Sequence, residues 1–597
     1  MFIKEWKCYF VNRQACDILG ALAESSFTSQ RALSERCGHS LGIVNRSLKE
    51  LKQAGYLDEH TQVTEQGWKL LRSRSPKNAV ILAAGFCMRM VPINTEVSKA
   101  FLEVNGEPLI ERLIRQLQEA GIRDITVVVG YLKESFEYLI DSFGVKLVVN
   151  TKFAAKNNLH SMKLVQEQIG NTYILPCDIW CRENPFRSRE LYSWYMVSDA
   201  LTGESDLRVN RNQELVSVQP AGEGNAMIGI CYLTEEDAAG VRERIGSYSA
   251  DRNYDRAFWE VSLYHKKRFC VQAKVVSASE VVEINTYEQL RELDRNSNHL
   301  KSNVLHTIAQ AFSTRTDNIR DITVLKKGMT NRSFLFSFRD KKYIMRIPGE
   351  GTDQLINRRQ EAEVYRAIAD YRLCDNIIHI DPVSGYKITE FFPSARTCDP
   401  ENVRDLERCM AKLRSFHELA LQVEHEFDIF GQIDFYEKLR EGVPSAYRDY
   451  KKTKEQVLSL KPYIEAHVTA RTLTHIDAVP DNFLFVRQEN GEEEIRLIDW
   501  EYAGMQDPHV DIAMFCIYAL YDRQQADRLI DAYFPEGCPE TIRTKIYCYI
   551  SACGLLWSNW CEYKRMLGVE FGEYSLAQYR YAKEFYRLAR QRIGEEA

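Results

Sequence analysis

The sequence predicts a multidomain protein of mixed α/β and α+β structure. Its 597 residues exceed what one hydrophobic core usually organises, because domains hold about 100–200 residues. Three stretches also differ in pattern: helices with a short hairpin over 1–76, alternating strands and helices over 77–295, and apolar segments around two polar motifs over 300–597. We therefore expect three domains with these boundaries, joined by polar segments at 73–78 and 292–303.

Bulk composition limits the partners and the compartment. The formal net charge is −6, so the chain as a whole has no bias toward polyanions. Its 16 cysteines are scattered without CxxC pairs, which favours free thiols in a reducing compartment. The first residues lack the apolar core of a signal peptide, and no run of about 18 apolar residues suggests a membrane span. We expect a cytoplasmic protein with no membrane partner, and the oligomeric state stays open.

Residues 1–76 predict three helices, over 14–25, 28–38 and 40–55, followed by a hairpin pattern over 56–67 and a helical piece over 67–74. This set resembles a winged helix-turn-helix, whose third helix enters the DNA major groove. The chain up to Asn78 holds 12 Lys and Arg against 8 Asp and Glu, with Arg46, Lys49 and Lys52 roughly on one helical face. DNA is therefore a candidate partner of 1–76; a docking or dimerisation module is the alternative.

The alternation over 77–295 predicts a doubly wound parallel sheet, in which ligands bind outside the carboxyl ends of the strands. The strand over 79–82 runs into the small residues Ala84 and Gly85, and the strand over 173–180 ends near Asp178. Backbone N–H groups of the loop would hold a triphosphate, with Arg89 and Lys99 as charge partners. Asp178 would bind Mg²⁺.

Five segments of this domain resemble the nucleotide-diphospho-sugar pyrophosphorylase fold, and more closely the bacterial phosphocholine cytidylyltransferases. They are LAAGFCMRM with SKAFLEVNGEPLIERLI, NTKFAAKNNLHSM, LPCDIW, AFWE and VEINTYEQL. The resemblance implies Arg89 and Lys99 on the phosphates of CTP, Mg²⁺ on Asp178 with Asn285, and Asn158 at the acceptor site. A phosphocholine acceptor needs aromatic faces around its quaternary ammonium. The candidates are Trp180, Trp194, Tyr195 and Trp259, of which one or two would line the pocket.

Three departures from that family pattern stand out. Cys87 and Met88 replace the usual Gly-Ser or Gly-Thr, Ser98 replaces a proline, and Asn285 replaces the second metal carboxylate. Asparagine can ligate through its amide oxygen but brings no charge, so we expect weaker Mg²⁺ binding. A degenerate nucleotide-sensing domain, acting within a DNA-binding regulator, is therefore the alternative to an active transferase.

The motifs LTHIDAVPDNFLF (473–485) and IRLIDWEYAG (495–504) have the spacing of a kinase catalytic centre. In that reading Asp477 orients and deprotonates the substrate hydroxyl, while Asn482 and Asp499 hold Mg²⁺ on ATP. Asp511, farther along the chain, would brace the catalytic loop by hydrogen bonding.

The preceding segment supplies the other parts of a kinase. Gly328 and Asn331 lie in a turn suited to cover phosphates, and Arg346 lies on a strand where kinases carry the ATP-binding lysine. Glu361 opens the next helix and could pair with Arg346. The strand over 386–392, with Glu390, would lie beside the adenine.

The set resembles the choline/ethanolamine kinase family, a protein-kinase-like fold. Arg-Ile-Pro-Gly (346–349), DWEYAG and the tail over 555–586 favour choline kinase. The resemblance implies choline and ATP as substrates, a tryptophan box of Trp557 and Trp560 around the trimethylammonium group, and Glu501 as added negative charge. Core packing is the alternative for the aromatic residues, and ethanolamine or another amino alcohol is the alternative substrate.

Together the two resemblances imply a bifunctional enzyme. The kinase would make phosphocholine from choline and ATP, and the cytidylyltransferase would convert it with CTP to CDP-choline. Resemblance alone suggests that the product serves phosphocholine decoration of a surface glycan or lipid. A choline kinase fused to an inactive partner domain remains a further alternative.

Overall fold

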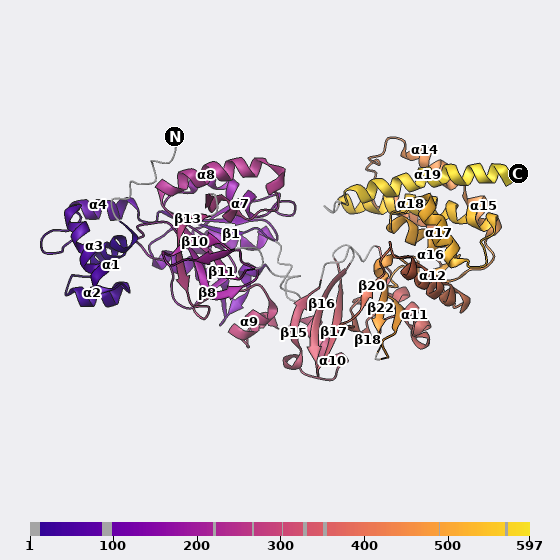
Figure 1. Ribbon diagram of the computed structural model, residues 1–597, viewed down its shortest axis with the longest axis horizontal. Helices are drawn as coiled ribbons and strands as arrows, with labels where there is room; N and C mark the ends of the chain where they lie inside the picture. Colours follow the sequence, from indigo (N-terminus) through magenta and orange to yellow (C-terminus); the bar gives the residue numbers. More distant parts are fainter. Residues whose placement is uncertain are drawn as a thin grey trace. The chain divides into compact units, whose positions relative to one another are not determined.

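The computed structural model describes residues 12–85, 98–218, 222–265, 268–300, 302–325, 331–349, 355–488, 490–566 and 571–596. The chain divides into two compact units, Met1–Asn303 and Val304–Ala597 (Figure 1). Within the described ranges no helix has the length and apolarity needed to cross a membrane. The cysteines in these ranges are all free thiols, as the sequence predicts.

The first unit begins with the predicted winged helix. Its helices are α1 (Arg13–Glu24), α2 (Gln30–Cys37), α3 (Leu41–Gln53) and α4 (Glu65–Ser73). Each begins where a side-chain oxygen of Asn12, Ser29, Ser40 or Thr64 accepts a backbone N–H of the first turn, which stabilises a helix start. The wing is short, closed by one antiparallel bridge between Leu57 and Val63.

The winged helix packs directly on the domain that follows it. Leu191, from the following domain, is buried in the same apolar cluster as the core of α1 and α3. The Tyr192 hydroxyl donates to Asp17 on α1 at 2.9 Å. The Arg189 guanidinium donates to the Ala23 carbonyl at 3.1 Å and lies 5.1 Å from the Trp68 ring centroid. The two parts of the first unit therefore share a packed contact rather than a free linker.

A ten-stranded sheet forms the rest of the first unit. Its order begins β5 (Lys146–Val149), β4 (Asp124–Val129), β1 (Asn78–Ala83) and β6 (Thr172–Pro176), all parallel. It continues with β11 (Gly224–Leu233), β8 (Trp194–Thr202), β13 (Arg268–Val276), β10 (Glu214–Ser217) and β9 (Leu207–Val209). The tenth strand, β12 (Tyr264–His265), pairs antiparallel with β13.

The sheet is mixed: its first four strands form the predicted parallel, doubly wound part, and antiparallel strands extend it. β11 runs antiparallel to both of its neighbours, β6 and β8. The reason is that no helix separates the strands between residues 194 and 233, and parallel neighbours need a long crossover, usually helical. The parallel half, which carries the predicted site, is as expected.

Helices cover both faces of the parallel half. Ile81 of β1 packs with Leu113 of α5 (Leu109–Glu119), while the next residue, Leu82, packs on the opposite side with Met162 of α7 (Asn158–Leu164) and with residues of α8 (Glu235–Ala250). A strand buried on both faces reads as a continuous apolar run, as 79–82 does. β1 and β6 are neighbours at the point where the strand order reverses, so their carboxyl ends form the expected crevice.

A buried carboxyl lies at the edge of this core. The Trp259 backbone N–H donates to Asn158 Oδ1 at 2.7 Å, and the Tyr195 hydroxyl donates to Glu260 Oε1 at 3.1 Å. Glu260 Oε2 is buried and accepts no hydrogen bond from the described residues. Burial raises the pKa of Glu260 to about 7, because the charged form loses its hydration.

The second unit has the two-lobed build of a protein kinase (Figure 1). One lobe is an antiparallel sheet in the order β15 (Arg320–Val324), β16 (Asn331–Phe338), β17 (Lys341–Pro348), β19 (Lys387–Glu390) and β18 (Ile377–Ile380), with helix α11 (Arg358–Ile368). The strand pairs β21 (Thr472–Thr474) with β24 (Gly504–Gln506), and β22 (Phe483–Arg487) with β23 (Glu493–Leu497), lie in the other lobe.

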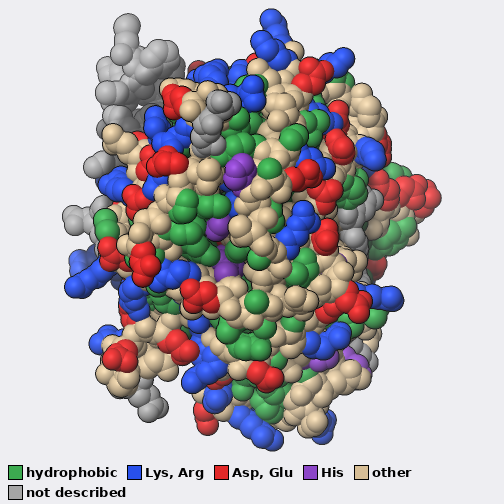
Figure 2. All heavy atoms as spheres, turned by 90° about the vertical axis from the view of Figure 1, so that its right-hand side faces the viewer, with side chains coloured by type: hydrophobic (Ala, Val, Ile, Leu, Met, Phe, Trp, Pro, Cys, Tyr) green, Lys and Arg blue, Asp and Glu red, His purple; other side chains and the backbone are tan. Residues whose placement is uncertain are grey.

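Helices make up most of that second lobe. They are α12 (Val403–Glu418), α13 (Ile429–Lys438), α14 (Tyr450–Leu458), α15 (Lys461–His467), α16 (His509–Tyr518), α17 (Arg523–Tyr533), α18 (Glu540–Met566) and α19 (Glu573–Glu596). Figure 2 shows one face of the protein on which Lys and Arg side chains are interspersed with Asp and Glu. That face therefore carries no extended field of one sign.

Replacing Glu260 with glutamine should remove a pH-dependent loss of stability. The native pKa of Glu260 is about 7, whereas a glutamate in an unfolded chain titrates near ~4.3. The native state therefore binds the extra proton, and stability falls as the pH rises through this window. We expect Glu260→Gln and wild type to melt alike at about pH 4 and the variant to melt higher at about pH 8.

Thermal unfolding of the full chain across this pH range checks the expectation. Glu243→Gln, at an exposed position of α8, is the matched control and should leave the pH dependence unchanged. Parallel pH profiles for Glu260→Gln and wild type would show that Glu260 ionises normally in the native protein.

Candidate active sites

Three predicted residues of the first unit lie together at the carboxyl ends of β1 and β6. Lys99 Nζ lies 2.9 Å from Asp178 Oδ2 and 2.7 Å from Asn285 Oδ1. The side chains of Lys99 and Asp178 are each 13% exposed, so the pair is partly shielded from water yet reachable by a ligand. An ammonium between a carboxylate and an amide oxygen is placed to neutralise phosphate charge.

Strand pairing puts a second carboxylate into this site. β14 (Val281–Glu283) pairs antiparallel with β7 (Ile179–Cys181), so that Glu283 lies opposite Ile179. Burial, reinforced by Asp178, raises the pKa of Glu283 to about 7. Our sequence analysis missed Glu283 as a site residue, although it stands two positions before Asn285 in the segment VEINT.

The predicted phosphate loop is described only at its start. Ala84 is buried, and its carbonyl accepts the backbone N–H of Tyr131 at 3.2 Å. An added Cβ at Gly85 would meet no atom of the described residues within 4 Å. Arg89, with Cys87 and Met88, lies outside the described residues, so its role stays a prediction.

The aromatic candidates of this unit mostly belong to the core. Trp259 is 1% exposed, Tyr195 0% and Trp194 2%, and the ring of Trp194 lies beneath Lys274 Nζ at 3.9 Å. Trp259 therefore packs in the core of the domain, and its role at an acceptor site stays a prediction. Trp180 is 9% exposed. Asn158 accepts the Trp259 N–H and so holds the segment that carries Trp259.

The second unit pairs Arg346 with Glu361, as predicted. The guanidinium makes a two-pronged contact, Nη1 to Oε1 at 2.5 Å and Nη2 to Oε2 at 2.8 Å. Both residues are buried, with 5% and 2% exposure. Burial alone would raise the pKa of Glu361, but the charge of Arg346 lowers it to about 2. The pair therefore stays ionised at any physiological pH and fixes α11 against β17.

Two further carboxylates converge on the same guanidinium. Asp499 Oδ1 and Glu501 Oε2 each lie 3.7 Å from Arg346 Nη1. Carboxylate oxygens of Glu361, Asp499 and Glu501 lie within 4.8 Å of one another. Arg358 adds a second cation, 3.1 Å from Glu361 and 3.4 Å from Glu501. Asp499 Oδ1 is buried and accepts no hydrogen bond from the described residues, so it has the capacity to ligate a metal.

The catalytic loop after β21 is held by hydrogen bonds. Asn482 Nδ2 donates to the Asp477 carbonyl at 2.8 Å and to Asp477 Oδ2 at 3.1 Å. Asp511, fully buried, accepts the backbone N–H groups of His475 and Ile476 at 3.0 and 2.7 Å. Burial, then the charges of Asp499 and Glu501, raise the pKa of Asp477 well above its usual range. A raised pKa suits a carboxylate that must accept a proton.

The remaining nucleotide-binding candidates fall in different places. Asn331 begins β16, and its Nδ2 donates to Glu501 Oε2 at 2.8 Å, inside the carboxylate group. Glu390 instead binds Lys341 at 3.0 Å and Asn376 at 2.9 Å across the sheet. The Glu390 carboxylate therefore accepts hydrogen bonds from two residues of the lobe that contains the antiparallel sheet. Gly328 lies outside the described residues.

Trp557 and Trp560 lie in one aromatic cluster with Tyr502 and Phe571. Successive ring centroids are 5.6 Å apart for Tyr502–Trp557, 6.0 Å for Trp557–Trp560 and 5.1 Å for Trp560–Phe571. Burial, Tyr436, Glu501 and Asp477 together raise the pKa of Tyr502, so the charge of the catalytic loop reaches this ring. Our sequence analysis missed Tyr502, which directly follows Glu501 in DWEYAG.

Two tyrosines of the predicted tail have structural partners instead. The Tyr579 ring stacks on Tyr447 with centroids 3.8 Å apart. The Tyr581 hydroxyl donates to the Tyr521 carbonyl at 2.8 Å. Both residues are buried between helices, which is the packing role that the sequence left open.

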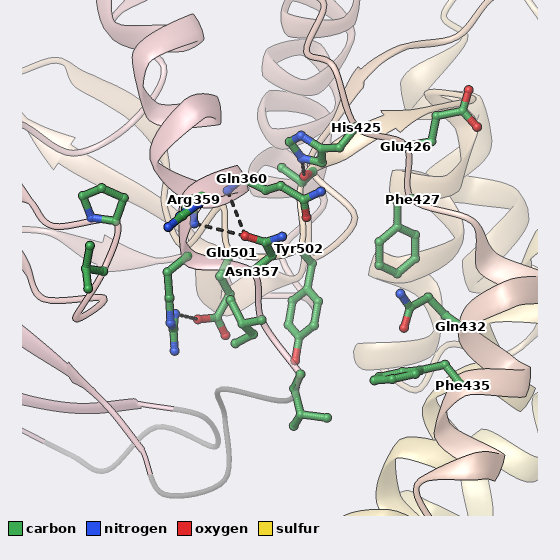
Figure 3. A pocket seen from close by; sticks show the side chains of 16 residues that line it. Asn357, Arg359, Gln360, His425, Glu426, Phe427, Gln432, Phe435, Glu501 and Tyr502 are labelled. Atoms are coloured by element: carbon green, nitrogen blue, oxygen red, sulfur yellow. Dashed lines mark hydrogen bonds and ion pairs between the residues drawn. The ribbon is translucent and has the colours of Figure 1, made fainter.

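A pocket of about 510 Å³ opens beside Glu501 and Tyr502. Figure 3 shows Phe427, Gln432 and Phe435 on one side of it, and Asn357, Arg359 and Glu501 on the other. Tyr502 lines this pocket and also contacts the aromatic cluster through Trp557. The pocket thus joins the carboxylate group to the aromatic cluster.

The basic residues of α3 are partly engaged within the winged helix. Arg46 donates to Gln14 Oε1 at 2.7 Å and lies 3.8 Å from Glu50. Lys52 donates to the Glu59 carbonyl at 2.7 Å, whereas Lys49 is exposed. Of the three basic side chains on this helical face, Lys49 is therefore the one that is fully available to contact a DNA phosphate.

Comparisons with known protein families match each part of the chain. Residues 12–58 match a winged helix-turn-helix DNA-binding family, residues 79–188 a MobA-like NTP transferase domain, and residues 322–533 the choline/ethanolamine kinase family.

Three curated relatives match at the level of whole proteins. The choline-phosphate cytidylyltransferase of Streptococcus pneumoniae is 31% identical over 227 residues, which are 37% of this chain and 99% of that protein. The 2-aminoethylphosphonate cytidylyltransferase of Lancefieldella rimae is 31% identical over 225 residues, or 36% and 92% of the two chains. Protein LicA of Haemophilus influenzae is 27% identical over 267 residues, or 42% and 95%. The chain therefore belongs to the choline-phosphate cytidylyltransferase family through a MobA-like nucleotidyltransferase domain, which it carries fused to a winged helix-turn-helix and a choline/ethanolamine kinase domain.

Proposed function

We propose that this protein makes CDP-choline in two steps, phosphorylating choline with ATP and then transferring a cytidylyl group from CTP to the phosphocholine. The observation that carries the proposal is the aromatic cluster beside Asp477, because a quaternary ammonium is bound by aromatic faces. The cytidylyltransferase relative, 99% of which is spanned by this chain, supports the second step.

In the kinase step Asp477 takes the proton of the choline hydroxyl. The hydroxyl oxygen then forms a bond to the γ-phosphorus of ATP, the bond to the β-phosphate oxygen breaks, and ADP leaves. Asn482 fixes the position of Asp477 through the contact at 3.1 Å. The aromatic cluster orients the ammonium end, so the chemistry depends mainly on positioning and charge.

Mg²⁺ fits the residues of both units. Asp499, with its buried oxygen free of hydrogen bonds, and Asn482 would hold the ion on ATP; Asp178 and Asn285 would hold it on CTP. The ion supplies charge neutralisation on the phosphates. Arg346 and Lys99 supply part of the same charge from the protein.

In the cytidylyl step a phosphate oxygen of phosphocholine attacks the α-phosphorus of CTP, and pyrophosphate leaves. Lys99 lies where it can stabilise the charge that builds on the phosphorus-bound oxygens. The Ala84–Gly85 backbone at the end of β1 and Arg89 complete the proposed phosphate site. Two relatives at 31% identity are named for different acceptors, choline phosphate and 2-aminoethylphosphonate. Fusion to a choline/ethanolamine kinase domain favours phosphocholine as the acceptor in this protein.

The second candidate function is that of a DNA-binding regulator. The observation that favours it is the docking of α1 onto the nucleotidyltransferase domain, which leaves Asn45, Arg46 and Lys49 of α3 exposed. In this case the nucleotidyltransferase domain would sense CTP or CDP-choline. Specific DNA binding with little turnover of CTP would favour it over the enzyme proposal.

Asp477→Asn should separate the two steps. Loss of the base should lower the choline-kinase kcat on the order of a thousandfold, while cytidylyl transfer to added phosphocholine stays at the wild-type rate. Phosphorus NMR of the full chain with choline, ATP, CTP and Mg²⁺ measures both products. Asp178→Asn is the reciprocal control and should abolish only the CTP-dependent step. Loss of both activities in either folded variant would contradict two independent sites.

Glu361→Gln should weaken the kinase unit and its use of ATP. Leaving Arg346 without its two-pronged partner should cost about 3 kcal/mol of unfolding free energy and raise the KM for ATP. Denaturant unfolding and ADP release measure these effects. Glu390→Gln is the matched control, because its carboxylate binds only neighbours across the sheet. A raised KM for ATP in Glu390→Gln would show that Glu390 contacts the nucleotide after all.

Asn285→Asp should lower the Mg²⁺ concentration that half-saturates cytidylyl transfer, because a carboxylate adds the charge that an amide lacks. Asn285→Ala, which removes the ligand oxygen, should raise that concentration. Titration of Mg²⁺ at fixed CTP and phosphocholine measures both. Equal requirements in all three proteins would place Asn285 outside the metal site.

A further inference from the structure

The aromatic cluster of the kinase unit extends to a carboxylate that the proposed mechanism does not use. Six rings follow one another with neighbouring centroids 5.1 to 6.5 Å apart, as in directly packed aromatic pairs. We call them the aromatic row; in order they are Tyr502, Trp557, Trp560, Phe571, Tyr574 and Tyr518. The Tyr518 hydroxyl, at the far end, donates to Asp481 Oδ2 at 2.7 Å.

Asp481 belongs to the catalytic loop. It lies in the short 3-10 turn Pro480–Asn482, directly before the proposed metal ligand Asn482 and four positions after Asp477. Burial, the contact with Asp481 and then the charge of Asp477 raise the pKa of Tyr518. The charge of Asp477 also contributes to the raised pKa of Tyr574, after burial and Cys561. The end of the aromatic row that holds Tyr574 and Tyr518 therefore also lies close to Asp477, the proposed catalytic base.

The charge of Asp481 is also the one that remains available. Asp499 and Glu501 share Arg346 at 3.7 Å, and Asp477 becomes neutral when it takes the substrate proton. Asp481 is exposed and forms no ion pair with the described residues; its partner there is a neutral hydroxyl. Because Tyr518 is half-buried at the end of α16, it holds the carboxylate in place without cancelling its charge.

A quaternary ammonium can be recognised only by aromatic faces and by negative charge, since it has no hydrogen to donate. We propose that Asp481 is a specificity-determining residue of the kinase: held by Tyr518, its exposed carboxylate attracts the ammonium group of the amino alcohol at the Tyr518 end of the aromatic row. This inference rests on the proposed kinase function. In it the aromatic rings select a substrate by the shape of its ammonium group, and Asp481 selects it by its positive charge.

The test compares choline with its neutral isostere 3,3-dimethylbutanol in wild type and Asp481→Asn, at low salt and at about 0.5 M NaCl. We expect Asp481→Asn to raise the KM for choline about fivefold at low salt, with kcat and the KM for ATP unchanged. The neutral alcohol should be used equally by both proteins. The difference for choline should shrink at high salt, where charges are screened over shorter distances.

Two further variants control for charge and for position. Asp340→Asn removes the same charge from the exposed turn between β16 and β17 and should leave every parameter unchanged. Tyr518→Phe keeps the carboxylate but removes the hydroxyl that holds it, and should give a smaller rise in the KM for choline. An equal loss for choline and its isostere, no loss in Asp481→Asn, or a loss that persists at high salt would overturn the inference.

Binding is measured separately from turnover by calorimetric titration with tetramethylammonium. Asp481→Asn should weaken this binding by the same factor as it raises the KM for choline. A wild-type protein that binds tetramethylammonium but phosphorylates no alcohol would overturn the proposed kinase function, while the effect of Asp481→Asn on binding would still decide the present inference. Unchanged tetramethylammonium binding in Asp481→Asn would overturn it.

Discussion

Both candidate sites depend on a cation held among oxygen ligands before any nucleotide arrives. In the kinase unit Arg346 lies within 3.7 Å of three carboxylates, and in the nucleotidyltransferase domain Lys99 bridges Asp178 and Asn285. Carboxylates this close would repel one another strongly in a partly buried site. An arginine, which does not lose its proton, lowers the pKa of Glu361 to about 2, whereas burial and the charge of Asp499 raise the pKa of Glu501 to about 7 in spite of the same guanidinium. The position of β17, α11 and the segment after β23 follows from that one guanidinium.

The catalytic loop depends on a second constraint, the buried carboxylate of Asp511. It accepts the two backbone N–H groups before Asp477 and a side-chain contact from His417 at 3.0 Å. These bonds hold Ile476 at φ 68°, a conformation that a β-branched residue rarely adopts. Such a position persists only when its surroundings determine it. Asp511 and His417, which lie outside the proposed substrate site, therefore determine the direction of the Asp477 side chain.

Motifs that are local in sequence could be read correctly, because their geometry depends on few other parts of the fold. Asp477 and Asn482 share one loop, and Arg346 and Glu361 lie on neighbouring elements. The solvent exposure of a side chain could not be predicted from sequence. A tryptophan such as Trp259 occurs in protein cores as well as in binding pockets, and the packing of strands that are distant in sequence decides between the two. Pairing of β14 with β7, which brings Glu283 to Asp178, depends on a contact across about a hundred residues of sequence.

The antiparallel half of the sheet escaped prediction for a related reason. Strands and helices alternate at the start of the domain, and this alternation predicted a parallel sheet. The later described strands follow one another without helices between them and so cannot all be parallel. Sequence also does not give the partners of Glu390: a polar residue on the expected hinge strand suggests a ligand contact, and in the structure Lys341 and Asn376 bind its carboxylate.

The contact between the winged helix and the nucleotidyltransferase domain bears on how such a chain could have been assembled in evolution. Leu191 is buried in the apolar cluster of the winged helix, and Arg189 and Tyr192 beside it form hydrogen bonds to the winged helix. An ancestor without the winged helix would have exposed an apolar patch at this position, which favours aggregation. The receiving surface and the winged helix are thus complementary to each other, as expected of two segments that have changed together since they were joined.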